Sequence, residues 1–231
     1  RYQSMHKPQV RSFWDNAVYH TGNMEVCALT GNKDYLQYSI DWADYNQWKG
    51  ATSNNKAEWR STYGESPEYV LFGDWQVCFQ TYADLYKLDP DTIKIARARE
   101  VMEYQMSTSK LDYWHWVDAL YMVMPVMVKM YDITKNPLYL EKLHQYLTVT
   151  DSIMYDREVG LYYRDAKYPY PFHKTINGKK DFWSRGDGWA FAAFAKVLKQ
   201  LPAEDKYREE YITRFQTMAK SIAAYQQPEG H

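Results

Sequence analysis

Trp189-Ala-Phe-Ala-Ala-Phe-Ala-Lys-Val-Leu198 is followed by Leu201-Pro-Ala-Glu-Asp205 and then by Lys206-Tyr-Arg-Glu-Glu-Tyr-Ile-Thr-Arg-Phe215. The first segment has the apolar pattern of a buried helix, and the last has the amphipathic, charged pattern of a solvated one. The proline and acids between them supply a stop for one helix and a cap for the next. The stretch therefore predicts a helical hairpin, with an inner apolar helix and an outer charged helix.

The same arrangement occurs three more times along the chain, with turns at Thr30–Asp34, Leu88–Thr92 and Thr134–Pro137. Repeated pairs of inner and outer helices are typical of an α/α toroid or solenoid. Strand signals are nearly absent, and Gly160–Asp165 is the one candidate. We therefore expect an all-α fold.

Composition narrows the class of protein. The chain has 231 residues, a net charge of -1 and 45% hydrophobic residues, enough for one large domain. Aromatic residues make up 17%, and their flat faces suit sugar stacking as well as core packing. Near-neutral charge argues against nucleic acid as the partner, and no apolar stretch approaches the roughly 20 residues of a membrane span. Cys27 and Cys78 read as buried thiols, and the histidines lack ligand spacing, so we expect neither metal nor cofactor.

Three long links lead back to the starts of inner helices: Lys49–Phe72, Ser107–His115 and Asp156–Trp183. In an α/α barrel such links lie at one end, where loops carry function. The helix starts that they reach carry acids, an arginine and several tryptophans: Gly73–Gln76, Trp114–Asp118 and Trp183–Trp189. Helix capping would explain the acids alone. A shared ligand site would explain the tryptophans and the arginine as well, and we favour it.

Asp118 is the strongest candidate for a catalytic acid. It falls in the first turn of a predicted helix that is apolar on nearly every side. Burial disfavours the ionised form of a carboxyl group and raises its pKa, so that it can donate a proton near neutral pH. The segment is equally compatible with a capping aspartate that accepts backbone N–H groups.

The other candidates suit an anionic sugar. Arg185 could pair with a carboxylate, while Trp183 and Trp189 could supply stacking walls. Asp74 is the second carboxylate, and two carboxylates could serve as acid and base. His115 would share a face with Asp118 if the helix begins that early, and it is equally compatible with a buried imidazole.

Three segments carry distinctive motifs: Trp183-Ser-Arg-Gly-Asp-Gly-Trp-Ala190, Trp116-Val-Asp-Ala-Leu-Tyr-Met122 and Gly73–Tyr86. They resemble segments of glycoside hydrolase family 105, the unsaturated rhamnogalacturonyl hydrolases, which are related to the unsaturated glucuronyl hydrolases of family 88. The first is similar to a Trp-Ala-Arg-Gly-Asn-Gly-Trp-Ala motif of that family, and the second is similar to the segment with the catalytic aspartate. Trp42–Trp48 fits the family more weakly.

The resemblance implies an (α/α)6 barrel that removes a 4,5-unsaturated uronic acid from the non-reducing end of lyase-generated oligosaccharides of the rhamnogalacturonan type. Asp118 would protonate C4 and then help water to add at C5, and Asp74 would assist. The substrate-binding residues would be His115, Trp116, Arg164, Trp183, Arg185 and Trp189. The partner would be the oligosaccharide, with no nucleic acid and no membrane, and the location the bacterial cytoplasm or periplasm; the oligomeric state is left open.

This chain departs from the family pattern in two motifs and in length. Asp187 stands where asparagine is usual, which would weaken attraction for a uronate, and Trp75 stands where a second aspartate is common. Four hairpins fall short of the six in a closed barrel, so we expect one α/α-barrel catalytic domain over residues 1–231, incomplete and truncated at both ends. The rival interpretations are a two-carboxylate inverting glycosidase, an epimerase, and a non-catalytic carbohydrate-binding protein.

Overall fold

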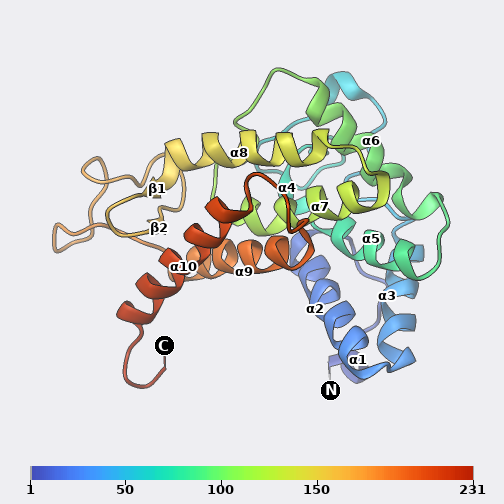
Figure 1. Ribbon diagram of the computed structural model, residues 1–231. Coiled ribbons are helices and arrows are strands. Elements are labelled where there is room, and N and C mark those ends of the chain that lie inside the picture. The colour runs from blue at the N-terminus through green and yellow to red at the C-terminus, as the bar shows by residue number, and fades with distance from the viewer. Residues whose placement is uncertain (1, 231) are drawn as a thin grey trace. The chain divides into compact units, whose positions relative to one another are not determined.

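The computed structural model describes residues 2–230 and contains the predicted hairpins (Figure 1). Their helices are α2 (Trp14–Thr30) with α3 (Lys33–Tyr45), α5 (Cys78–Leu88) with α6 (Ile93–Ser107), α7 (Asp118–Thr134) with α8 (Leu138–Met154), and α9 (Ser184–Gln200) with α10 (Arg208–Tyr225). Short helices α1 (Tyr2–Met5) and α4 (Gly73–Gln76) and the 3-10 turn η1 (Lys56–Glu58) complete the helical elements of this range. The all-α prediction is confirmed.

The hairpin turns use the stop and cap residues that the sequence predicts. Gly31 ends α2 with φ 67°, and its N–H donates to the carbonyl of Cys27. A positive φ suits glycine, which has no Cβ to clash with the backbone. The side chain of Asn32 then accepts the N–H of Asp34 and caps α3.

The chain divides into two compact units, which are described separately. The first runs to Lys110 and takes in Lys129–Tyr139; the second takes in Leu111–Val128 and the chain from Leu140 onward. The prediction of one catalytic domain, truncated at both ends, stays a prediction. No helix among residues 2–230 is long and apolar enough to cross a membrane.

The core of the first unit is aromatic. The ring of His20 stacks on Trp42 with centroids 4.0 Å apart, and its Nδ1 lies 3.0 Å from the hydroxyl oxygen of Ser39. Burial lowers the pKa of His20 to about 3, so the imidazole is neutral at pH 7. Cys78 is buried as predicted, whereas Cys27 is half-buried, because it lies on a face of α2 that is only partly covered.

The second unit is built around the start of α7 and a small hairpin. Strand β1 (Tyr155–Asp156) pairs antiparallel with β2 (Leu161–Tyr162), which confirms a strand in the predicted Gly160–Asp165 segment. Gly160 makes the turn at φ 78°, where an added Cβ would lie 2.6 Å from Cγ2 of Thr217. The hairpin therefore packs closely on α10, and α10 in turn packs along α9 (Figure 1).

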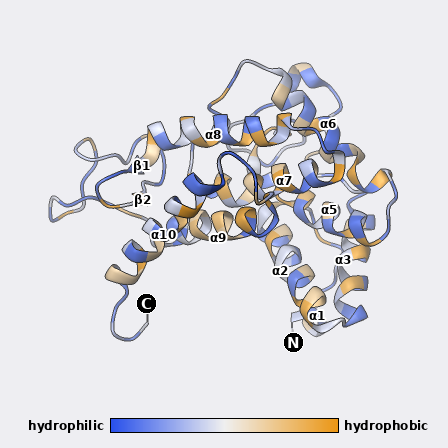
Figure 2. Cartoon of the chain, viewed as in Figure 1, coloured by the Kyte–Doolittle hydropathy of each residue, from blue (hydrophilic) through white to orange (hydrophobic). Residues whose placement is uncertain are grey.

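The burial of residues differs between helices α7 and α9. Residues of α7 from Ala119 to Val128 are all buried, whereas α9 buries only one side, including Ala190, Phe194 and Val197. Figure 2 colours the same helices by the hydropathy of their residues. An apolar stripe on one side of a helix is the pattern of an element that packs on a core with that side alone. The distinction between inner and outer helices therefore holds for α7 more fully than for α9.

Candidate active site

Asp118 begins α7 and is placed there by a neighbouring strand segment. The N–H of Val117 donates to the carbonyl of Arg164 at 2.9 Å, and Trp116 forms an antiparallel bridge with Asp165. The residue before Asp118 is thus tied to the backbone that carries Arg164. Because both ends of this contact are backbone, the hydrogen bond itself does not depend on side-chain rotamers.

The carboxyl group of Asp118 is half-buried, and its Oδ1 has no hydrogen-bond partner among the described residues. Burial raises its pKa from 3.8 to about 6, against the opposing effect of the guanidinium groups of Arg185 and Arg164. A capping aspartate would accept backbone N–H groups, which would lower its pKa. The geometry therefore favours the proton-donor interpretation over the capping one.

Arg164 and Arg185 both lie near the ring of Trp183. The guanidinium carbon of Arg185 is 4.4 Å from the centroid of the indole ring, and that of Arg164 is 6.0 Å from it. Both arginines are exposed, and Arg164 also lies near Asp165, with 3.6 Å between Nη1 and Oδ2. Two solvent-accessible guanidinium groups that both act on Asp118 can receive an anionic group next to that acid.

The remaining aromatic candidates of this unit lie on the same elements. Trp189, on α9, packs against Tyr121, on α7, with ring centroids 4.6 Å apart. His115 and Trp116 lie edge to face at 4.8 Å. Because α7 begins at Asp118, the expectation that His115 shares a helical face with that residue is wrong. His115 instead lies in the extended segment that leads to the bridge at Trp116.

Asp74 belongs to the first unit. It lies in α4 and is 6% exposed, beside Trp75, whose indole N–H donates to the carbonyl of Gly64, and Gln76, whose amide donates to Gln105 at 2.9 Å. These contacts fix the start of this helix firmly. The role of Asp74 in the reaction of Asp118 stays a prediction.

Asp187 is the residue whose importance the sequence understates. It is 3% exposed, and its Oδ1 accepts the N–H of Tyr162 at 2.8 Å. Burial raises its pKa to about 7, although this hydrogen bond lowers it in part. In the sequence, Asp187 stood out only because asparagine is usual at this position. That difference suggested an effect on the binding of a charged substrate and gave no indication of a hydrogen bond to the backbone.

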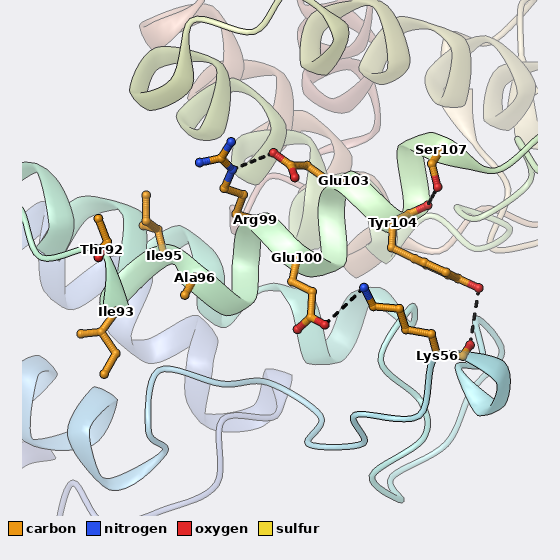
Figure 3. Close-up of a pocket in the computed structure, with 10 residues that line it drawn as sticks. All are labelled: Lys56, Thr92, Ile93, Ile95, Ala96, Arg99, Glu100, Glu103, Tyr104 and Ser107. Atoms are coloured by element: carbon orange, nitrogen blue, oxygen red, sulfur yellow. Dashed lines mark hydrogen bonds and ion pairs between the residues drawn. The ribbon is translucent and has the colours of Figure 1, made fainter.

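Each unit has a surface groove that is not lined by Asp118. One, of about 730 Å³, runs along α6 and contains ion pairs between Arg99 and Glu103 and between Lys56 and Glu100 (Figure 3). It includes none of the predicted site residues. The other, of about 670 Å³, is mostly apolar and is lined in part by Asp187 and Phe191. Among residues 2–230, no three His, Cys, Asp or Glu side chains are grouped to hold a metal ion.

Comparison with known proteins identifies the class to which this helical fold belongs. A solved structure described as a polysaccharide lyase is 71% identical, with a TM-score of 0.94, over 95% of this chain and 62% of its own. A family 105 glycoside hydrolase of C. acetobutylicum superposes with a TM-score of 0.73 at 19% identity, over 98% of this chain and 64% of its own. The fold is thus that of the α/α-barrel carbohydrate-active proteins, matched over part of their length.

The sequence places the chain within that class. The profile of Glycosyl Hydrolase Family 88 matches residues 1–231, and the chain belongs to this family, in the superfamily that also includes family 105. A curated relative, the unsaturated 3S-rhamnoglycuronyl hydrolase of Formosa agariphila, is 26% identical over 227 residues. The alignment covers 94% of this chain and 58% of that relative. The predicted family and fold class are confirmed.

Proposed function

We propose that the protein is a hydrolase that removes a 4,5-unsaturated uronic acid from the non-reducing end of an oligosaccharide by hydrating the double bond. The observation that carries this proposal is Asp118, whose Oδ1 has no hydrogen-bond partner and whose pKa burial raises to about 6. A carboxylic acid with such a pKa can give and take a proton near neutral pH. Two exposed arginines beside it supply the partner for a uronate.

The reaction needs one acid/base group. Protonated Asp118 gives its proton to C4 of the C4=C5 double bond, and positive charge develops at C5. Water adds at C5 and gives a proton to the Asp118 carboxylate, which restores the acid. The product at C5 is a hemiketal, whose ring opens spontaneously and releases the next sugar.

The two arginines have a second effect on this chemistry. In the free protein their positive charges hold the pKa of Asp118 below the value that burial alone would give. A bound uronate would neutralise part of that charge, so the pKa of Asp118 would rise when substrate binds. The acid would then be protonated in the complex at a pH where it is partly ionised in the free protein.

The substrate that we propose has a uronate linked to rhamnose. The relative from Formosa agariphila and a second one from an Alteromonas species, 32% identical over 118 residues, are both named for unsaturated 3S-rhamnoglycuronyl substrates. The rhamnogalacturonan-type substrate expected from the motifs shares the rhamnose. Trp183 and Trp189, with Trp116 and His115, are the aromatic surfaces that we assign to the sugar rings.

A second candidate function is a lyase reaction, which the name of the 71% identical structure favours. A lyase removes the C5 proton of a uronate, the C4–O bond to the preceding sugar breaks, and the C4=C5 double bond forms. The leaving oxygen takes up a proton and departs as the hydroxyl group of that sugar. Asp118 would serve as the base in its ionised form, which dominates above pH 6. The two reactions therefore change the same chromophore in opposite directions.

The test is to follow the ultraviolet absorbance of the conjugated double bond with the full-length protein. Unsaturated uronyl–rhamnose oligosaccharides and the intact polymers would be offered in parallel. We expect absorbance to fall on the oligosaccharides, and Asp118→Asn to abolish the change while Glu204→Gln, at an exposed acid in the α9–α10 turn, leaves it intact. A rise on the polymer would establish the lyase. No change on any substrate would favour a two-carboxylate glycosidase or a binding protein.

A further inference from the structure

Asp187 connects the two parts of the second unit that hold the arginines. It lies in the first turn of α9, two residues after Arg185, and accepts the N–H of Tyr162. Tyr162 in turn lies two residues before Arg164 on the same extended segment. One buried hydrogen bond thus joins the helix that carries Arg185 to the strand that carries Arg164.

The extended segment continues from this contact to Arg164, which bonds to the residue before Asp118. The N–H of Tyr163 donates to the carbonyl of Met154 at 2.8 Å, and the carbonyl of Arg164 accepts the N–H of Val117. An extended segment held at consecutive residues has little freedom to shift. A change in the position of Tyr162 would therefore be passed on to Arg164 and to the start of α7.

A second contact brings the start of α9 against the same point. A Cβ added to Gly186 would lie 2.6 Å from Cγ1 of Val117, so backbone and side chain approach as closely as glycine permits. The residue before Asp118 is thus contacted by the strand and by α9. Asp187 follows Gly186 and holds these two elements together.

We propose that Asp187 is a positioning residue that fixes Arg164 and Arg185 relative to Asp118 through its hydrogen bond to the Tyr162 backbone. This inference rests on the proposed function, because it concerns the same site. It also assigns a reason for an acid or an amide at this position: both side chains offer an oxygen that can accept the N–H. Alanine offers none, and it would leave a buried N–H without a partner.

The experiment compares Asp187→Asn with Asp187→Ala in the full-length protein. We expect Asp187→Asn to keep kcat and KM within a few-fold of the wild type. Asp187→Ala should lower kcat/KM by roughly 10²-fold, because displacement of about 1 Å at a reacting centre has that effect. In Asp187→Ala, KM should rise and kcat should fall together, because the change displaces both the arginines that bind the uronate and the acid Asp118.

A matched control separates position from loss of stability. Tyr162→Phe removes the hydroxyl that Asp151 accepts at 2.6 Å but keeps the backbone N–H that Asp187 holds. It should lower Tm and change kcat and KM of the folded protein far less than Asp187→Ala does. If Asp187→Ala also lowers Tm alone, with normal kcat and KM, the positioning role is overturned.

Hydrogen exchange supplies a readout that does not depend on the reaction. The amides of Tyr162 and Val117 should exchange faster in Asp187→Ala than in Asp187→Asn or Tyr162→Phe. Faster exchange in a protein that acts on none of the sugars would support the link and reject the proposed function. Unchanged exchange at both amides, in a protein that hydrates the double bond, would reject the link and keep the function.

Discussion

Two aspartates of the second unit have arginines for neighbours and opposite surroundings. Asp151, on α8, is 7% exposed; its Oδ2 lies 2.7 Å from Nη2 of Arg214, and its Oδ1 accepts the hydroxyl of Tyr162. Asp118 is half-buried, its Oδ1 accepts no hydrogen bond from the described residues, and its arginines act on it only through their charge.

The comparison shows that the presence or absence of hydrogen-bond partners, more than burial, separates a structural aspartate from one that can transfer a proton. A buried carboxylate that is paired with a guanidinium group and accepts a hydroxyl group holds elements together. A carboxyl group without such bonds is poised to exchange a proton. We therefore expect substitutions around Asp151 to change stability and those around Asp118 to change the reaction.

The largest effect should come from Asp118→Asn. Loss of a general acid/base should lower kcat by roughly 10²–10⁴-fold. Because Oδ1 of Asp118 makes no hydrogen bond, Tm should not fall. The double-bond absorbance assay and a thermal melt check the two parts. A large drop in Tm would show that Asp118 is a structural residue and would remove the contrast with Asp151.

Asp151→Ala should produce the reverse pattern. It leaves the guanidinium of Arg214 buried without its carboxylate partner, which typically costs about 3–5 kcal/mol in the free energy of unfolding. Denaturant unfolding measures the loss. The double variant Asp151→Leu with Arg214→Met should recover much of it, since no buried charge then remains. A double variant as unstable as the single one would contradict this account.

The pH dependence of stability should reveal Asp187. Its pKa is about 7 in the folded protein and near 3.8 in the unfolded chain, so the folded state binds the proton more tightly. The contribution of Asp187 to stability should therefore fall as pH rises from about 4 to 7, by up to roughly 4 kcal/mol at 1.36 kcal/mol per pKa unit. Asp187→Asn should remove most of this slope in denaturant unfolding between those pH values, whereas Glu204→Gln should not.

Arg185→Gln should sharpen the comparison through the pH profile. Removing one positive charge near Asp118 raises the pKa of its carboxyl group. The fall of kcat/KM on the alkaline side of pH 6 should move to higher pH, while KM rises. Arg185→Lys keeps the charge and should leave the profile closer to that of the wild type. A profile that does not move in Arg185→Gln would remove Arg185 from the electrostatics of the site.

The smallest effect should come from a pair of glycines in α9. Gly186→Ala forces a Cβ against Val117 and should destabilise by about 1–3 kcal/mol, with some loss of activity. Gly188→Ala has no atom within 4 Å of the added Cβ and should be neutral or stabilise by about 0.5–1 kcal/mol. Equal effects of both changes on Tm would show that the close approach at Gly186 is unimportant.

The helical hairpins and the candidate acid could be predicted because the residues that specify them are close together in the sequence. Each hairpin turn has its stop and cap within five residues, so the order of the long helices follows from the sequence. The same holds for Asp118, whose apolar surroundings are its neighbours along α7. The shared helical face of His115 and Asp118 depended on where α7 begins, and nothing in the sequence fixes that residue between His115 and Asp118. The role of His115 in substrate binding stays a prediction.

The contacts that build the site are not local. The hydrogen bond from Val117 to Arg164 spans 47 residues of sequence, and the one from Tyr162 to Asp187 spans 25. Both involve backbone atoms, which carry no residue-specific signal. The role of Asp187 could be assigned only when the partner of its carboxylate was known.

The link between β2 and α9 has a practical consequence for engineering. Its first residues include Arg164 and Asp165, which are tied to Val117 and Trp116, and its last is Trp183, beside Arg185. Between them, Tyr170, Phe172 and Ile176 are exposed, and Ile176 fully so. Segments from relatives could be grafted between Pro169 and Lys179, which keeps both anchored ends and also Tyr168, whose hydroxyl accepts from Nη1 of Arg164 at 3.3 Å. Such chimaeras would vary the surface offered to longer oligosaccharides and leave the proton-transfer group in place.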